Sequence, residues 1–252
     1  MLFTFLGLAV AVLAVGQFIR HTPTPPATTV VPAATALPPP RPPLTKTQAA
    51  GTAPGDAVPG GGRAAPAGAG EFGFAEGSGP VLGSGGPVRH FKVGVERSTG
   101  RAGADFADQV DRTLGDARGW TADGGLRLQR VPATASSDFT IYLADSATAQ
   151  KMCAAGGLTV DPTTSCRMPG QVVINATSWA GGIPGYGAPL GVFRAYVINH
   201  EVGHQLGYGH EACPGPGRPA PVMMEQAYGL QGCVPNAWPN LGGHRYAGNS
   251  ER

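Results

Sequence analysis

The sequence predicts an α+β domain that follows a long segment rich in proline, alanine and glycine. Two observations lead to this prediction. From about Pro80 to Tyr246, the spacing of apolar residues changes between the two-residue period of strands and the four-residue steps of helices. These stretches occur in the order strand, helix, three strands, helix and then an irregular C-terminal region, which is typical of an α+β fold.

Four stretches of the domain are expected to be strands. Residues 89–96 alternate between apolar and polar side chains, which is the pattern of a half-buried strand. Residues 126–131, 138–145 and 171–177 are expected to be the three strands that follow the first helix. Residues 153–170, before the last of these strands, are predicted to form a loop-rich insertion.

Two helices are expected, over residues 105–118 and 190–206. Each has apolar residues three or four positions apart, so each has one apolar face that can pack against a sheet. A glycine- and proline-rich loop precedes the second helix, and turns are expected beyond its end. The apolar residues of the two faces are Phe106, Val110 and Leu114 in the first helix and Leu190, Phe193 and Val197 in the second.

The first twenty residues contain an apolar segment, residues 2–19, with no charged side chain. As a helix it would extend about 27 Å, just enough to cross the core of a bilayer. It is either a signal anchor or a signal peptide cleaved near Gly16. No basic residue precedes it, and Arg20 follows on the side expected to be outside, against the positive-inside rule; a misplaced start codon would explain both. We therefore expect an extracytoplasmic protein, anchored to the membrane by residues 1–20 or secreted.

Residues 21–79 are expected to form a disordered linker, because sequence this rich in proline, alanine and glycine cannot pack a core. The domain is then expected over residues 80–247, with a short tail over 248–252. The chain has 18 basic and 16 acidic residues and a net charge of +2, so nothing in its charge favours binding to nucleic acid. We expect a monomer.

The four cysteines lack the paired Cys-x-x-Cys spacing of structural zinc sites. Their even number behind an export segment favours two disulfides instead. Three connectivities are possible. We expect the sequential one, which closes the shortest loops: Cys153 with Cys166, and Cys213 with Cys233.

Three of the six histidines lie in the eleven residues HEVGHQLGYGH, residues 200–210. Side chains four positions apart share one face of a helix, so His200 and His204 can bind one ion. Gly207 allows a sharp turn because glycine accepts positive φ, and the turn can return His210 as a third nitrogen ligand. Three protein nitrogens with one open position are typical of a catalytic Zn²⁺ site.

Glu201 is the expected catalytic residue of this site. It follows His200 and points about 100° round the helix axis, so its carboxylate is expected to reach a water on the metal rather than the metal itself. A zinc ion lowers the pKa of bound water from about 15.7 to about 7. Glu201 would then take a proton as the water attacks a carbonyl, and pass it to the leaving amine.

The pattern His-Glu-x-x-His-x-x-Gly-x-x-His resembles the signature of the metzincin clan of zinc metallopeptidases. The stretch that begins YVINHEVGHQLGYGH and ends PVMMEQ is similar to a secreted actinobacterial family whose metzincin-like domain has no assigned function. The resemblance implies a methionine turn beneath the metal, with Met223 as its methionine and Met224 as the alternative. It also implies a twisted mixed sheet with two helices and an irregular C-terminal subdomain. Substrate would lie along an edge strand, here residues 163–168.

Two positions bear on which branch of the clan the chain resembles. Some branches place a tyrosine two residues after the turn methionine to help at the transition state, but this chain has Glu225 there. Glu211 directly follows the third histidine, as in the astacin branch, where that glutamate pairs with a new N-terminus.

The function predicted from these residues is that of an extracytoplasmic zinc endopeptidase acting on a protein or peptide substrate. One alternative is a zinc amidase that acts on cell-wall peptides. A second is a catalytically inactive binding domain that keeps zinc for structure. The presence of Glu201 argues against the second, because a structural site needs no base.

Overall fold

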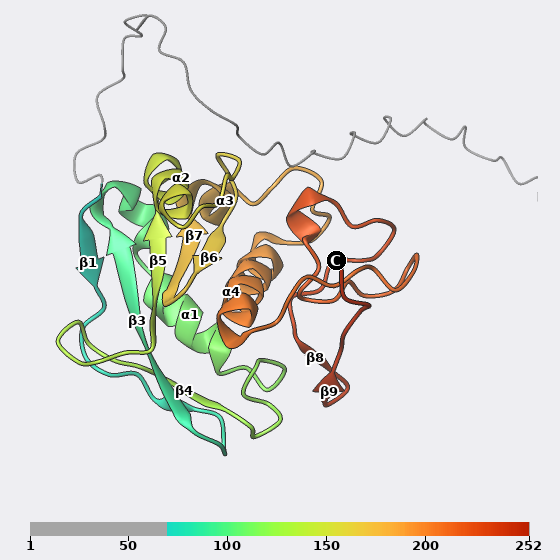
Figure 1. Cartoon of the computed structure of the whole chain (residues 1–252), viewed down its shortest axis with the longest axis horizontal. Helices are drawn as coiled ribbons and strands as arrows, with labels where there is room; N and C mark the ends of the chain where they lie inside the picture. Colours follow the sequence, from blue (N-terminus) through green and yellow to red (C-terminus); the bar gives the residue numbers. More distant parts are fainter. Residues whose placement is uncertain (1–69, 252) are drawn as a thin grey trace, which may run out of the picture. The chain divides into compact units, whose positions relative to one another are not determined.

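The computed structural model describes residues 70–251, which form a mixed α+β fold with one mixed sheet and four α-helices (Figure 1). Seven strands form the sheet in the order β2-β4-β3-β5-β7-β6, and β1 pairs with the end of β3 that β4 leaves open. The strands are β1 (Phe72–Phe74), β2 (Val81–Leu82), β3 (Val88–Glu96), β4 (Arg127–Arg130), β5 (Phe139–Ala144), β6 (Cys166–Met168) and β7 (Gln171–Asn175).

The four strands predicted from the sequence are the four parallel strands β3, β4, β5 and β7. In β3, alternate residues such as Phe91 and Val93 are buried, as the two-residue period predicted. In β7, Val172 and Val173 are both fully buried, because helices cover both faces of the sheet there. The three remaining strands, β1, β2 and β6, are antiparallel to their neighbours.

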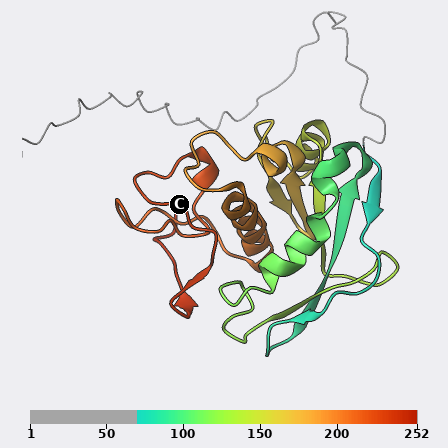
Figure 2. The same ribbon diagram turned by 180° about the vertical axis from the view of Figure 1, so that it is seen from behind.

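The two predicted helices are present as α1 (Phe106–Leu114) and α4 (Leu190–Leu206). Helix α1 ends at Leu114, with Gly115 as its cap, before the predicted end at Arg118, because residues 116–119 form turns instead. Helices α1 and α4 contact each other and cover one face of the sheet (Figures 1 and 2). Their apolar faces and those of β3, β5 and β7 form the main hydrophobic core.

Two further helices, α2 (Ser146–Ala155) and α3 (Ala176–Gly181), were not predicted from the sequence. Only the last three residues of α2 fall within the expected loop-rich insertion, residues 153–170, which also contains the unpredicted strand β6. The buried residues of α2, Ala149 and Cys153, are too small to give a clear apolar period. Its first turn is fixed by Asp145, which accepts a hydrogen bond from the Thr148 amide. The resemblance implied two helices, and the described residues form four.

The domain begins before Pro80, so the predicted end of the linker at Gly79 is too late. Strand β1 lies within the range assigned to the linker and pairs with β3, and Phe72 packs against Tyr142 with ring centroids 4.9 Å apart. The strand has only three residues, with Gly73 at its centre, so its sequence shows no recognisable strand pattern. The segment predicted to anchor the chain or direct its export, and the linker up to residue 69, lie outside the described residues. Among residues 70–251, none of the helices has the length and apolar character needed to cross a membrane.

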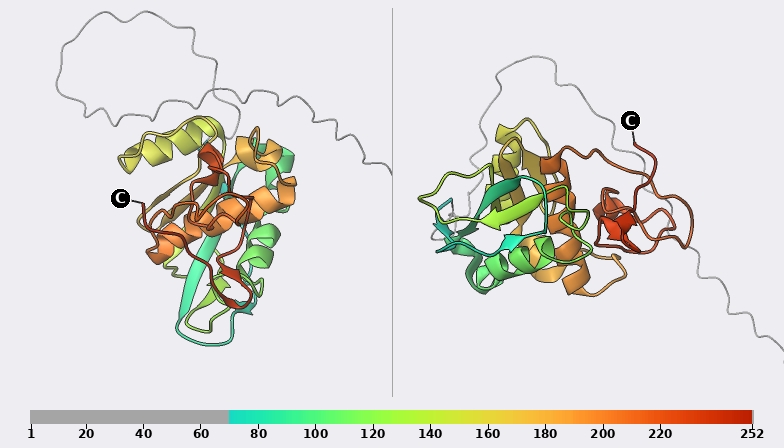
Figure 3. Two further views of the ribbon diagram at one scale, coloured as in Figure 1. Left: turned by 90° about the vertical axis from the view of Figure 1, so that its right-hand side faces the viewer. Right: turned by 90° about the horizontal axis from the view of Figure 1, so that it is seen from below.

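The C-terminal region after Gly207 is largely irregular, as predicted, and lies on the opposite side of α4 from the sheet (Figures 1 and 3). Both predicted disulfides are confirmed: Cys153–Cys166 joins α2 to β6, and Cys213–Cys233 closes a loop of the C-terminal region. The short elements after Gly207 are η2 (Gln226–Tyr228), β8 (Asn240–Leu241) and β9 (His244–Arg245).

Candidate metal centre

Helix α4 carries the first part of the histidine motif and ends where the motif requires a turn. Gly207 has φ of 102°, a left-handed conformation that a residue with a side chain rarely adopts. The Gly207 amide donates to the His204 carbonyl, and the Tyr208 amide donates to the Gly203 carbonyl, which is the hydrogen-bond pair of a Schellman motif. The chain therefore reverses within a few residues and returns toward the helix at His210.

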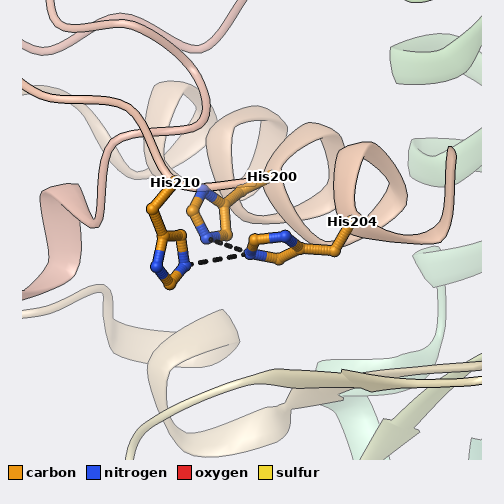
Figure 4. Close-up of side chains that lie close together, drawn as sticks. All are labelled: His200, His204 and His210. Atoms are coloured by element: carbon orange, nitrogen blue, oxygen red, sulfur yellow. Dashed lines mark hydrogen bonds between the residues drawn. The ribbon is translucent and has the colours of Figure 1, made fainter. Parts of the chain in front are cut away.

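The side chains of His200, His204 and His210 converge on one point (Figure 4). The Nε2 atom of His204 lies 3.1 Å from that of His200 and 3.0 Å from that of His210. One ring nitrogen from each residue falls within 4.8 Å of the other two. These are separations at which three nitrogens can bind a single ion.

The hydrogen bonds of two of these rings determine which nitrogen carries the proton. The Nδ1 atom of His200 lies 2.9 Å from the Val222 carbonyl oxygen, and the Nδ1 atom of His204 lies 2.8 Å from the Tyr208 carbonyl oxygen. A carbonyl oxygen only accepts, so each Nδ1 must donate, and the Nε2 of each neutral ring is left with a lone pair.

The two Nε2 lone pairs of His200 and His204 therefore face each other. Burial, followed by the neighbouring His204, lowers the pKa of His200 to about 3, so a proton is not expected to separate the two nitrogens at neutral pH. Burial is also the main cause that lowers the pKa of His204. This donor set suits a metal cation, because a cation can lie between lone pairs that would otherwise repel.

Glu201 lies next to the three histidines but is not part of the cluster of ligand atoms. It is 6% exposed, and burial, together with the nearby carboxylate of Glu225, raises its pKa to about 8. The resulting group is a buried carboxyl that can change protonation near neutral pH, as a general base requires.

Met223 is fully buried against the helix that carries the first two histidines. A Cβ atom on Gly203 would overlap the Sδ atom of Met223 and lie 2.7 Å from Cζ2 of Trp120, so the methionine packs directly on the helix between His200 and His204. Met224, the alternative for the turn methionine, instead packs in a separate small cluster with Ala220 and Cys233.

Glu211 pairs within the chain. Its carboxylate lies 2.6 Å from a guanidinium nitrogen of Arg245 and accepts a hydrogen bond from the Gly248 amide. Burial nevertheless raises its pKa, and Arg245 opposes that shift. The ion pair ties the residue after the third histidine to strand β9, so this glutamate already has a partner other than an N-terminus.

Three polar residues near the histidines were not among the predicted site residues. Glu225 Oε1 lies 3.3 Å from His210 Nε2. Tyr228 shares a hydrogen bond of 3.0 Å with Thr164, whose segment leads into β6. Arg167, in β6, donates from Nε to Gln205 Oε1 at 3.0 Å. Thr164 and Arg167 both belong to the predicted edge segment, residues 163–168. Each contacts a residue far away in the sequence, Tyr228 and Gln205 respectively.

The comparisons with known proteins give one match. A family model described as "Protein of unknown function (DUF3152)" matches residues 58–238. The match covers most of the chain and includes all three histidines. No curated protein and no solved structure matches the chain.

Proposed function

The chain belongs to the DUF3152 family, which is described as being of unknown function, and from the chemistry of its site we propose that it is a zinc-dependent endopeptidase of the metzincin type. The observation that carries this proposal is the orientation of His200 and His204. Their Nδ1 atoms are held by backbone carbonyls, and their Nε2 atoms lie 3.1 Å apart. Together with His210 they are the residues that would hold the ion.

A zinc ion at these three nitrogens would supply a Lewis acid that polarises a substrate carbonyl and makes a water molecule more acidic. Glu201 is the residue placed to move the proton. Its carboxylate would accept a proton from the attacking water, hold it because burial favours the neutral acid, and donate it to the leaving amine. The carbonyls of Val222 and Tyr208 keep two of the imidazoles oriented throughout.

Several features support the metzincin type. The histidine-bearing helix ends at a left-handed glycine, a buried methionine packs against that helix, and an antiparallel strand, β6, forms the edge of the sheet beside it. Two residues after Met223, where some metzincin branches have a tyrosine, this chain has Glu225. The proposal therefore assigns no transition-state role to a tyrosine at that position.

The two disulfides support an extracytoplasmic location, because such bonds persist in oxidising compartments. We propose that the N-terminal apolar segment either anchors or exports the domain. A protein or peptide in the cell envelope or outside the cell is then the expected substrate.

The direct test uses the purified protein with its disulfides formed. We expect one zinc ion per chain and hydrolysis of an unfolded protein such as casein, lost with a chelator and restored by Zn²⁺. Purified cell-wall material is the second substrate. Hydrolysis of wall peptides but not of casein would replace the endopeptidase by the amidase. Zinc content with no hydrolysis of either would support the inactive binding domain, and a folded, active and metal-free protein would contradict the proposal.

A further inference from the structure

Strand β6 has one free edge beside the metal centre. It pairs with β7 on one side and is the last strand in the sheet order, so no other strand of residues 70–251 pairs with its second edge. Helix α4, which carries His200 and His204, contacts both β6 and β7. An extended peptide that adds to this edge would therefore pass next to the histidines.

Arg167 is the central residue of β6, and its side chain lies on the α4 face of the sheet. Directly paired residues of antiparallel strands share a face, and Arg167 pairs with Val172, which belongs to the core formed with α1 and α4. Cys166 and Met168 belong to the cluster on the α2 face. The strand thus directs one side chain toward the metal centre, and that side chain carries a positive charge.

One hydrogen bond holds Arg167 beside the histidines. Its Nε atom donates to Gln205 Oε1 at 3.0 Å, and Gln205 directly follows His204 in α4. Anchoring through Nε leaves the two terminal amino groups of the guanidinium as donors.

No acidic side chain balances this charge within the part of the chain that the structure describes. The ion pairs found there use other basic residues. A half-buried guanidinium whose terminal amino groups have no acidic partner, at a free strand edge, is suited to bind a carboxylate through paired hydrogen bonds.

We propose that Arg167 is a specificity-determining residue that selects peptides with an aspartate or glutamate at the position opposite it. The residue of a bound peptide that pairs with Arg167 across the free edge would place its side chain on the α4 face, within reach of the guanidinium. This inference rests on the proposed peptidase function, and it adds the substrate class: peptides acidic at one fixed position near the cleaved bond.

The test uses the zinc-loaded, disulfide-bonded protein and a set of peptides. The peptides form pairs that differ at one position: one member has glutamate there, and the other has glutamine, which is uncharged and similar in shape. The varied position is moved along the peptide on both sides of the cleaved bond. At one position we expect the glutamate peptide to have a kcat/KM about 5- to 30-fold higher, the range expected for one charge-assisted hydrogen-bonded pair. Arg167→Gln should bring this ratio close to one at that position alone, and Arg167→Lys should retain part of it.

The control is Arg112→Gln, which removes the same charge from an exposed residue of α1 and should leave the ratio unchanged. Peptide affinity measured in the Glu201→Gln variant gives a readout that does not depend on turnover, and it should show the same preference for glutamate. Cleavage without any preference, or a preference that survives Arg167→Gln, would overturn the inference and leave the peptidase proposal standing. Neither cleavage nor binding of any peptide would overturn both.

Discussion

The Nε2 atoms of His200 and His204 lie 3.1 Å apart, and neither neutral ring has a proton to place between them. The spacing of four residues puts both rings on one face of α4, and the carbonyls of Val222 and Tyr208, from the C-terminal region, fix the orientation of the two rings. Two of the three proposed ligands are therefore prearranged, and the third arrives through the turn at Gly207.

Removing one ligand should remove the metal. We expect His204→Ala to lose bound zinc and hydrolysis together, because two nitrogens hold the ion far less tightly than three. His244→Ala is the matched control, since this exposed histidine in β9 is not part of the cluster. Metal analysis of both variants decides the matter; equal zinc content would argue against the proposed ligands.

Removing the proposed base should separate metal binding from turnover. Glu201→Gln keeps the shape of the buried side chain and should retain zinc, while kcat falls by about 10²–10⁴. Zinc content, thermal unfolding and kcat are measured on one preparation. Full activity in this variant would exclude Glu201 as the general base, whatever the metal content.

The metal-free protein should show a pH dependence that comes from Glu201. Burial raises its pKa from 4.5 to about 8, so between these values the folded state binds a proton that the unfolded state has released. The free energy of unfolding should therefore decrease as pH rises from about 4.5 to about 8. Chemical denaturation with chelator present measures this slope.

The Glu201→Gln variant serves as the control for that slope. The lowered pKa of His200 acts in the opposite direction, since stability should fall as pH drops from 6.5 toward 3, and it is common to both proteins. The difference between the pH slopes of the two proteins is therefore the contribution of the Glu201 carboxyl. An identical pH dependence would mean that Glu201 is not buried as its surroundings indicate.

Two glycines of α4 should respond to alanine in opposite ways. Gly203→Ala would place a methyl group against Met223 and Trp120, and we expect a loss of about 1–3 kcal/mol in the free energy of unfolding. Gly191→Ala meets nothing within 4 Å and should gain about 0.5–1 kcal/mol from helix propensity. Denaturation curves give both values, and the losses from Gly203→Ala and Met223→Ala should be less than additive in the double variant, because the shorter side chain leaves room for the added methyl group.

The parts of the fold that could be predicted are those whose pattern is complete within a short stretch of sequence. Helix α4 has its apolar residues, its two motif histidines and its terminal glycine in one run, so its bounds were predicted correctly. Helix α2 buries only Ala149 and Cys153, and β1 has only three residues with Gly73 at its centre, so neither has a period that can be recognised. Both are held in place by tertiary contacts.

The same distinction applies to the site. The convergence of His200, His204 and His210 follows from helical spacing and one turn, and it was predicted. The pairing of Glu211 with Arg245, and of Arg167 with Gln205, joins segments that only the folded chain brings together. Charges of this kind have no local pattern, so their partners could not be identified from the sequence.

The position of the Cys213–Cys233 bond has a consequence for when the site can be completed. The bond closes a loop that begins three residues after His210 and contains Met223, so the segment that follows the third histidine is constrained by a covalent bond that needs an oxidant to form. A chain still in a reducing cytosol would have the two helical histidines but a loosened third. We expect the reduced protein to bind zinc more weakly than the oxidised one, which a competition assay with a chelator would measure. Export would then protect the producing cell, because the protein would become able to hydrolyse its substrate only after it had left the cytoplasm.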